Sequence, residues 1–241
     1  MRVEELYSGK AKTLYRIEPG KLLMRFRDDV TAFDGKRKEV AGGKGVLSAK
    51  TSAKLFELLE EAGIPTHYIC YRGGPDMIVK EAKVIPIEVI VRNYAYGSLL
   101  KRMPLLKPLQ KFTRPIIELH FKSDELHDPL ILPQDVIEAG LLTEDELREV
   151  ERLALEVNNV LRNFFESKGY RLIDFKIEVG RVDGKLVVVD ELSGDTMRIL
   201  DSEGRHLDKE VFRKGGSVQE LLEAYKRLAE IVGEPRRVCE Q

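Results

Sequence analysis

Apolar side chains recur at helical spacing in three stretches of the chain. The clearest starts after Thr143 and runs to Gly169, and a second starts after Ser217 and runs to Gly233. Thr143 and Ser217 each stand three residues before a glutamate, which is the signature of a capping box at a helix N-terminus. Together with an apolar face at residues 55–62, the pattern predicts three helices.

Short apolar segments separated by turn residues predict strands. Residues 14–17 and 22–26 flank a Glu-Pro-Gly-Lys sequence that is typical of a hairpin turn. Residues 84–91 are too apolar for an exposed strand, so we expect them inside the protein. Pro86 within this segment predicts an edge, a bulge or a crossing between domains. Residues 171–190 contain a further strand pair around an Asp-Gly turn.

The order of these elements predicts an α+β fold with two lobes. Residues 1–80 are expected to form an N-terminal antiparallel β lobe, and residues 81–241 a larger mixed α/β lobe. The length of 241 residues, with 43% hydrophobic and 34% charged residues, fits one large domain or two small domains that share a cleft.

Charge and apolar runs exclude several classes of protein. The 40 basic and 41 acidic residues nearly cancel, which argues against a general binder of nucleic acid or membrane surfaces. No stretch approaches about 18 consecutive apolar residues, and the first five residues lack an apolar signal core. We therefore expect a cytoplasmic protein that does not cross a membrane. Cys70 and Cys239 are expected to be too few and too distant for a disulfide framework or a thiolate metal site.

One predicted strand carries charged groups in a row. From Asp174 to Val179 polar and apolar residues alternate strictly, so Asp174, Lys176 and Glu178 share one face of the strand. If the apolar face packs, a carboxylate, an ammonium and a second carboxylate remain on the other. An exposed strand with solvated charges is the alternative interpretation.

The turn after this strand decides where Asp190 lies. A two-residue turn at 183–184 would pair Glu178 with Val189 and send Asp190 to the other face, whereas a three-residue loop would set Glu178 opposite Asp190. We predict the longer loop, because it matches apolar residues with each other and keeps Asp190 out of the packed face. Two facing carboxylates repel unless a cation lies between them, and Mg²⁺ carrying phosphate oxygens would suit this position.

Two glycine-containing segments near the N-terminus suit anions. Lys10 and Lys12 point the same way at strand spacing, and Gly9 permits close approach of the backbone, which suits a polyphosphate. A charged edge strand is the alternative. Residues 42–45 (GGKG) precede a helix and offer backbone amides to an anion, although the chain contains neither a Walker loop nor a dinucleotide fingerprint.

Arginines mark a second candidate anion site. Arg92 ends the apolar strand shortly before Ser98, and its planar donor fork with a nearby hydroxyl suits phosphate or carboxylate. A structural pair with Glu88 or a helix C-terminus is equally compatible, and Arg198 presents the same alternatives.

The histidines lack metal-ligand spacing, and no serine or cysteine has the context of a nucleophile elbow. A cationic, carboxylate-lined cleft remains, as metal-assisted phosphoryl transfer requires.

Residues 84–98 (VIPIEVIVRNYAYGS) and 172–180 (LIDFKIEVG) resemble the two signature segments of the SAICAR synthetase family. The following supporting segments are similar to the family in sequence and order: residues 7–12, 28–34, 120–122, 128–129, 190–191, 195–198, 208–209 and Arg213. The resemblance implies a two-lobed fold related to ATP-grasp enzymes, with the nucleotide held between the lobes. It also implies an ATP-dependent ligase that joins 5-amino-1-(5-phosphoribosyl)imidazole-4-carboxylate to L-aspartate, giving SAICAR, ADP and phosphate in purine biosynthesis.

The same resemblance implies roles for individual residues. It implies Mg²⁺ contacts at two carboxylates, Glu178 and Asp190. It implies that Lys176 steadies the phosphoryl group during its transfer. It also implies that Arg198 acts in catalysis as well as in binding, and that Asp34 helps to position the substrate. Contacts with ATP are implied for Lys10, Lys12, Ala82, Lys122, Glu178 and Asp190. Contacts with the other substrates are implied for Arg92, Ser98, Asp174, Asp195 and Arg198.

Other functions share part of this pattern. A kinase, or another carboxylate–amine ligase, would keep the ATP-side residues without using Arg92, Ser98 and Arg198. A nucleotide-sensing or assembly module would bind without turnover. The family reading is favoured because both signatures include substrate-side residues, and it implies a homodimer as the default assembly.

Overall fold

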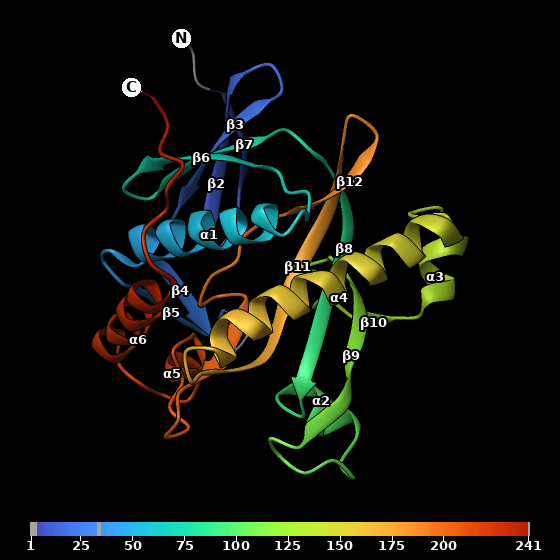
Figure 1. The fold of residues 1–241 in the computed structure, drawn as a ribbon, viewed down its shortest axis with the longest axis vertical. Helices are drawn as coiled ribbons and strands as arrows, with labels where there is room; N and C mark the ends of the chain where they lie inside the picture. The colour runs from blue at the N-terminus through green and yellow to red at the C-terminus, as the bar shows by residue number, and fades with distance from the viewer. Residues whose placement is uncertain (1–3, 33–34, 241) are drawn as a thin grey trace.

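The computed structural model describes residues 4–32 and 35–240, and their strands lie in three sheets (Figure 1). The first sheet is antiparallel, in the order β1-β2-β3-β7-β6. Its strands are β1 (Glu4–Ser8), β2 (Lys12–Glu18), β3 (Lys21–Phe26), β6 (Tyr68–Gly73) and β7 (Asp76–Lys80). Glu18 pairs with Lys21, so the hairpin predicted at this turn is confirmed.

The second sheet is also antiparallel and begins only two residues after the first one ends. It has the order β10-β9-β8-β11-β12, with β13 pairing β11. Its strands are β8 (Lys83–Tyr94), β9 (Lys111–Phe121), β10 (Leu130–Ile131), β11 (Arg171–Val182), β12 (Lys185–Val189) and β13 (Met197–Leu200). A small third sheet pairs β4 (Asp29–Ala32) with β5 (Arg37–Val40). The link at residues 81–82 is the crossing between the two large sheets.

Pro86 lies where β8 loses its regular pairing with β11. The register shifts between Glu178, which pairs with Glu88, and Gly180, which pairs with Val84. Proline has no N–H to give to the ladder, and on the β9 side its carbonyl accepts a hydrogen bond from Lys122 N at 3.0 Å. Of the three alternatives that Pro86 suggested, the structure shows a bulge in a central strand, and the edge is wrong.

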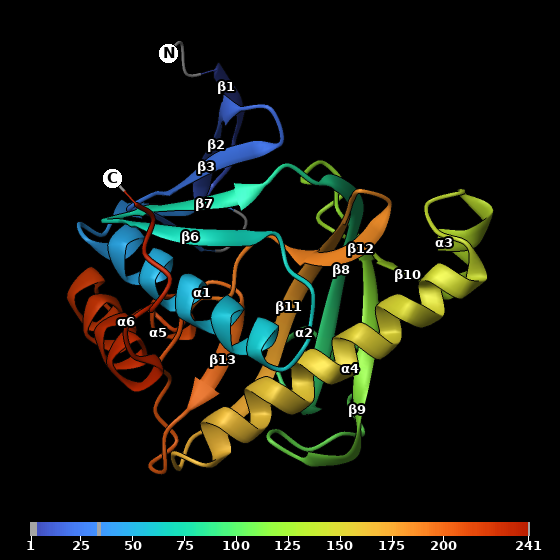
Figure 2. The same cartoon turned by 45° about the horizontal axis from the view of Figure 1, so that its top comes forward.

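The helices cover these sheets. Helix α1 (Lys44–Glu61) lies against the first sheet, and α4 (Glu144–Glu166) crosses β11, β8 and β9 of the second (Figure 2). Helix α6 (Val218–Val232) packs on α1. Three short helices complete the set: α2 (Ser98–Arg102), α3 (Pro133–Glu138) and α5 (Glu210–Arg213). None of the described helices combines the length and apolar character that a membrane span needs.

Capping boxes and a common core fix the long helices. Thr143 accepts from Glu146 N, and Ser217 accepts from Glu220 N, so both predicted capping boxes are present. One continuous apolar cluster includes Met24 of the first sheet, Phe56 of α1 and Phe175 of the second sheet, joined to the buried face of α4. The two sheets are thus anchored in the same core.

The turn between β11 and β12 differs from our prediction. Val182 pairs with Lys185 and Glu178 pairs with Val189, so the turn has two residues and the longer loop is wrong. Asp183 and Gly184 both have positive φ, 50° and 76°, as a type I′ turn requires. The preference of Asp-Gly for this turn outweighed the apolar pairing that favoured the longer loop.

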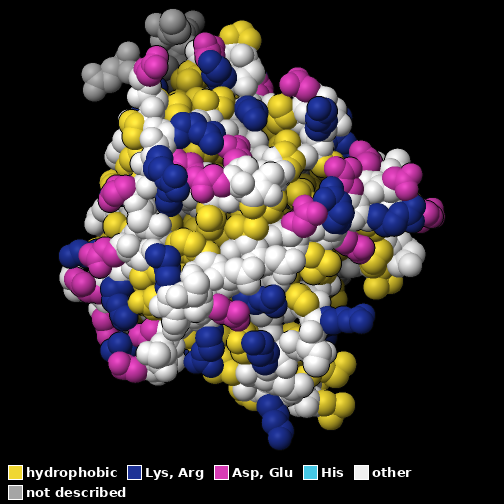
Figure 3. Space-filling view, viewed as in Figure 1, with side chains coloured by type: hydrophobic (Ala, Val, Ile, Leu, Met, Phe, Trp, Pro, Cys, Tyr) yellow, Lys and Arg dark blue, Asp and Glu magenta, His cyan; other side chains and the backbone are white. Residues whose placement is uncertain are grey.

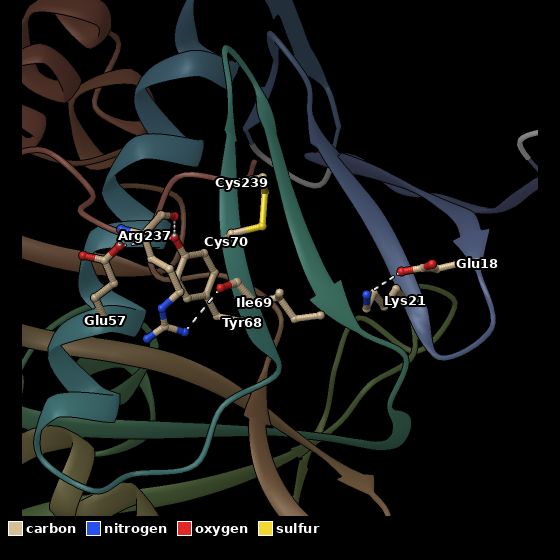
Figure 4. Close-up of a disulfide and its surroundings, with 8 residues drawn as sticks. All are labelled: Glu18, Lys21, Glu57, Tyr68, Ile69, Cys70, Arg237 and Cys239. Carbon is tan, nitrogen blue, oxygen red and sulfur yellow. Dashed lines mark hydrogen bonds and ion pairs between the residues drawn. A yellow bond between two sulfur atoms is a disulfide. The ribbon is translucent and has the colours of Figure 1, made fainter. Parts of the chain in front are cut away.

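The cysteines also differ from our prediction, because Cys70 and Cys239 form a disulfide across 169 residues (Figure 4). The C-terminal tail lies beside β6, where Tyr71 N donates to Arg237 O at 2.8 Å and Cys239 N donates to Tyr71 O at 2.9 Å. Glu57 of α1 accepts hydrogen bonds from Arg237 N at 2.7 Å and from Arg236 N. Distance along the chain was a poor guide because the tail returns to the first sheet.

Replacing Cys239 is expected to destabilise the fold. Cys239→Ser should lower the free energy of unfolding by about 2–4 kcal/mol, because a crosslink over a long loop limits the unfolded chain. Denaturant unfolding without reductant measures this. Adding Cys70→Ser to the first substitution should cost little more, and an unchanged unfolding midpoint in Cys239→Ser would contradict the prediction.

Candidate active site

Two adjoining cavities share a wall of charged residues. The first, of about 640 Å³, is lined by strands of both large sheets. The second, of about 460 Å³, lies along β8, β11 and β13. Both are lined by Glu88, Lys176, Asp195 and Lys209, so a ligand in one cavity would face a ligand in the other across these side chains. Basic and acidic groups are mixed over the face of the molecule shown in Figure 3.

The first cavity combines apolar walls with ammonium groups. Ala82, in the link between the two sheets, lines it together with Lys10, Lys12 and Lys122. The apolar lining comes from both sheets and includes Leu14, Leu22, Met24, Val79, Val84 and Val189. Such a cavity suits a ligand with a flat ring and an anionic tail.

Lys12 is held by two carboxylates at the end of β12. Its Nζ lies 2.6 Å from Asp190 Oδ1 and 2.8 Å from Glu191 Oε1, and all three side chains are nearly buried. Burial by itself lowers the pKa of Lys12, but the charges of the two carboxylates outweigh it and raise the pKa above its ordinary value. Lys12 is therefore a fixed cation.

A left-handed residue brings Asp190 into the cavity in spite of the short turn. The strand β12 ends at Val189, and Asp190 has a φ of 72°. This change of direction releases Asp190 from the alternation that would place it in the packed face. Burial raises the pKa of Asp190, but Lys12, Lys176 and Lys122 outweigh burial and hold it below its usual range.

Lys176 lies in the shared wall, and Glu178 lines the first cavity beside it. Lys176 Nζ lies 2.6 Å from Glu88 Oε1, and Lys122 Nζ lies 2.5 Å from Glu178 Oε2. Burial, and then the negative charge of Asp190, raise the pKa of Glu178. Burial alone lowers the pKa of Lys176, yet Asp190, Glu178 and Glu88 together raise it. The Glu178 and Asp190 carboxylates thus repel each other within a set of lysines.

This pair of carboxylates fits a metal that brings most of its own ligands. Among residues 4–32 and 35–240, no three His, Cys, Asp or Glu side chains are arranged to hold a metal ion. Mg²⁺ commonly takes one or two carboxylates and completes its shell with phosphate oxygens and water. Glu178 and Asp190 can supply the one or two carboxylates of such a site. The described residues do not form a complete cage of protein ligands.

The second cavity is built around Arg92. Its guanidinium donates to Glu118 Oε1 and Oε2 at 2.8 and 2.9 Å, to Asp174 Oδ2 at 2.8 Å and to Ser98 Oγ at 3.1 Å. The suggested pair with Glu88 is wrong, because Glu88 holds Lys176. Arg92 is only 2% exposed, so its carboxylate partners are what permit its burial.

Arg198 completes this group from β13. It donates to Asp174 Oδ2 at 2.9 Å and lies 3.1 Å from Glu210 Oε1. Burial lowers the pKa of Arg198, but the charges of Asp174 and Glu210 outweigh this and raise it. Burial also raises the pKa of Asp174, which the two arginines only partly offset. Asp174 therefore joins two arginines that both line the second cavity.

The structure brings the predicted site residues together wherever it describes them. Asp34 lies outside the described residues. The first cavity is lined by Lys10, Lys12, Ala82, Lys122, Lys176, Glu178, Asp190 and Asp195. The second is lined by Arg92, Ser98, Asp174, Lys176, Asp195 and Arg198.

Sequence reasoning missed four residues of the site. Glu88 and Glu118 each interrupt an apolar run in a buried strand, which was a usable signal. Glu191 follows Asp190 directly and shares Lys12 with it. Lys209 stands in residues 208–209, one of the segments that resemble the family, but no role was assigned to it, and the fold brings it to both cavities.

Comparisons with known proteins agree over most of the chain. The family model described as SAICAR synthetase matches residues 5–231. The phosphoribosylaminoimidazole-succinocarboxamide synthase of Caldivirga maquilingensis is 53% identical over 229 residues, which are 95% of each chain. The crystal structure of the synthase from Ehrlichia chaffeensis has a TM-score of 0.91 at 34% identity and covers 95% of this chain and 98% of that one. A SAICAR synthetase in complex with ADP has a TM-score of 0.90 at 44% identity, covering 98% of this chain and 100% of that one.

Proposed function

The chain belongs to the SAICAR synthetase family, and from this premise we propose how its own side chains carry out the reaction. It is an ATP-dependent ligase of purine biosynthesis that joins 5-amino-1-(5-phosphoribosyl)imidazole-4-carboxylate to L-aspartate, with release of ADP and phosphate. The observation that carries the assignment of residues is the meeting of two cavities, one with apolar walls and ammonium groups and one with arginines, at Lys176.

We assign ATP to the first cavity. Its apolar walls suit the adenine ring, and the link at Ala82 offers backbone groups to the ring edge. The phosphates then extend toward Lys10, Lys12 and Lys122. Lys12 supports this orientation best, because its two carboxylate partners keep it charged and in place before the nucleotide arrives. Such preorganised charge costs no rearrangement during the reaction.

We assign the imidazole nucleotide to the second cavity. Arg92, Ser98 and Arg198 suit its ribose phosphate, and Asp174 holds both guanidinium groups in fixed positions. Arg198 is about 20% exposed, whereas Arg92 is nearly buried, so Arg198 forms the outer contact and Arg92 the inner one. The carboxylate of the substrate then faces Lys176 in the shared wall.

The chemistry requires activation of that carboxylate. An amide does not form from a carboxylate and an amine in water without help, so phosphoryl transfer from ATP makes one carboxylate oxygen a leaving group. Lys176 lines both cavities and remains charged, which suits it to neutralise the oxygens of the transferring group. Glu178 and Asp190 would hold Mg²⁺, which neutralises phosphate charge when it is bound. Asp195 and Asp34 are the remaining residues proposed to position substrates.

Three further features belong to the same proposal. The division into residues 1–80 and 81–241 follows the crossing between sheets at residues 81–82. A cytoplasmic location agrees with a pathway whose substrates are soluble phosphorylated metabolites. A homodimer is the assembly that the family resemblance implies, and size-exclusion chromatography with light scattering would measure it.

Omitting each substrate tests the function itself. ADP release by the purified protein with Mg²⁺ is expected to require ATP, the imidazole carboxylate nucleotide and L-aspartate together, with the succinyl group found in the product. ADP formed equally well without aspartate and without amide product would indicate a kinase. Binding of ATP without turnover in any mixture would favour a sensing module.

Loss of either proposed metal-holding carboxylate should slow the reaction. Glu178→Ala and Asp190→Ala are each expected to reduce turnover by about 10²-fold or more, as removal of a preorganised charge stabiliser does. Steady-state rates at saturating Mg²⁺ measure the effect. Glu149→Ala, an exposed acid on α4, serves as control and should retain normal turnover. Near-normal rates in both cavity variants would refute their role.

A substitution at Gly97 should act on the imidazole nucleotide alone. A Cβ at Gly97 would lie 3.0 Å from Nη1 and 3.1 Å from Nη2 of Arg198, at a φ of 62° that favours glycine. Gly97→Ala is therefore expected to raise the KM for the imidazole nucleotide by about tenfold while the KM for ATP changes little. Gly140→Ala has a similar φ of 67° with open space around it, so it controls for the effect of a positive φ alone. Equal changes in both KM values would count against the assignment of Arg198.

A further inference from the structure

Lys209 lies at the meeting of the two cavities and has no part in the roles assigned so far. It precedes α5, its backbone N donates to Gly194 O at 2.9 Å, and its side chain is only about 15% exposed. It lines both the first and the second cavity. A buried amine at this point faces the place where the activated carboxylate and the attacking amine would come together.

The carboxylate nearest to Lys209 is shared with other groups. Lys209 Nζ lies 3.5 Å from Asp195 Oδ1, whereas Lys44 Nζ lies 2.6 Å from Asp195 Oδ2 and is almost completely buried. The hydroxyl of Tyr225 also donates to Asp195 Oδ1, at 3.0 Å. The negative charge of Asp195 therefore balances mainly the positive charge of Lys44. Lys209 has only a longer contact with Asp195.

We propose that Lys209 is the general base that takes a proton from the amine of L-aspartate. This inference rests on the proposed function and adds a catalytic residue to it. The neutral Nζ accepts one proton from the aspartate ammonium, and the freed amine forms the C–N bond to the activated carboxyl carbon. The bond from that carbon to the phosphorylated oxygen breaks, and the second amine proton leaves with inorganic phosphate. Lys209 then returns its proton to water.

The charges around Lys209 support this role. The groups that face it are Asp195, Lys44 of α1 and Arg213 of α5, while Tyr225 of α6 reaches it only through Asp195. Burial is the main cause that lowers the pKa of Lys209, and Arg213 and Lys44 lower it further against the opposing charge of Asp195. Lys12 and Lys176 have raised pKa values in the same cleft, so they are unsuited to accept a proton.

Two substitutions and two nucleophiles separate a base from an anchor for a carboxylate. Lys209→Arg places a permanent positive charge at this position but cannot act as a base, and Lys209→Met supplies neither a charge nor a base. Both variants are expected to lose about 10²-fold or more in kcat with L-aspartate. With hydroxylamine, which is largely unprotonated at neutral pH and needs no base, both should form ADP and the hydroxamate at nearly the wild-type rate.

Either of two results would overturn the proposal. Recovery of aspartate turnover in Lys209→Arg would show that charge alone matters. Equal loss with hydroxylamine and with aspartate in both folded variants would place Lys209 in nucleotide binding or carboxylate activation. An inactive wild-type protein with all three substrates would instead overturn the proposed function, and this inference with it.

A neighbouring lysine provides a test on a protein that retains Lys209. Lys44→Met removes a nearby cation and leaves Asp195 to Lys209, so the pKa of Lys209 should rise. The ascending limb of kcat against pH with L-aspartate is therefore expected to move to higher pH, with its plateau retained. The profile with hydroxylamine should not move in that range. An unshifted limb with aspartate would contradict the assignment even if Lys209→Met fails to fold.

Discussion

The cleft depends on the pairing of charged positions across β8 and β11. In this register Asp174 lies beside Arg92 and Glu178 lies beside Glu88, inside a sheet whose other face is packed against α4. Charged groups in such a position are stable only if each one finds partners of opposite sign. A slip of one residue along this pair would reverse the faces and place the charges in the core.

This requirement explains why the charged side chains that we propose to bind ligands also form ion pairs with one another. Glu178 and Asp190 repel each other, and lysines compensate that repulsion in the structure. Lys122 and Lys12 thus stabilise these two carboxylates through close ion pairs. In the second cavity Asp174 joins Arg92 to Arg198, and both guanidinium groups are in place before a phosphate binds. The binding groups are preorganised because the empty cleft must also satisfy its charges.

Local signals in the sequence predicted most of the elements and part of the site. The capping boxes at Thr143 and Ser217 and the alternation around Lys176 are properties of neighbouring residues, and they held. The register after β11 was wrong, yet Asp190 still reaches the cavity because its φ is positive, and no spacing rule contains that information. Glu118 as the partner of Arg92 depends on how β9 pairs with β8. The Cys70–Cys239 bond depends on the path of the tail, and both are long-range outcomes of the fold.

The buried lysines show that burial alone does not decide their protonation. Lys12, Lys176 and Lys209 all lie largely enclosed in the cleft, and burial lowers the pKa of all three. Lys12 contacts Asp190 and Glu191, and Lys176 faces Glu88, Glu178 and also Asp190, so each of these ammonium groups has at least two carboxylates near it. Lys209 shares Asp195 with Lys44 and has Arg213 nearby, so cations outnumber the carboxylate there. The local ratio of carboxylates to cations therefore keeps Lys12 and Lys176 positively charged. The same ratio suits Lys209, another lysine of the cleft, to accept a proton.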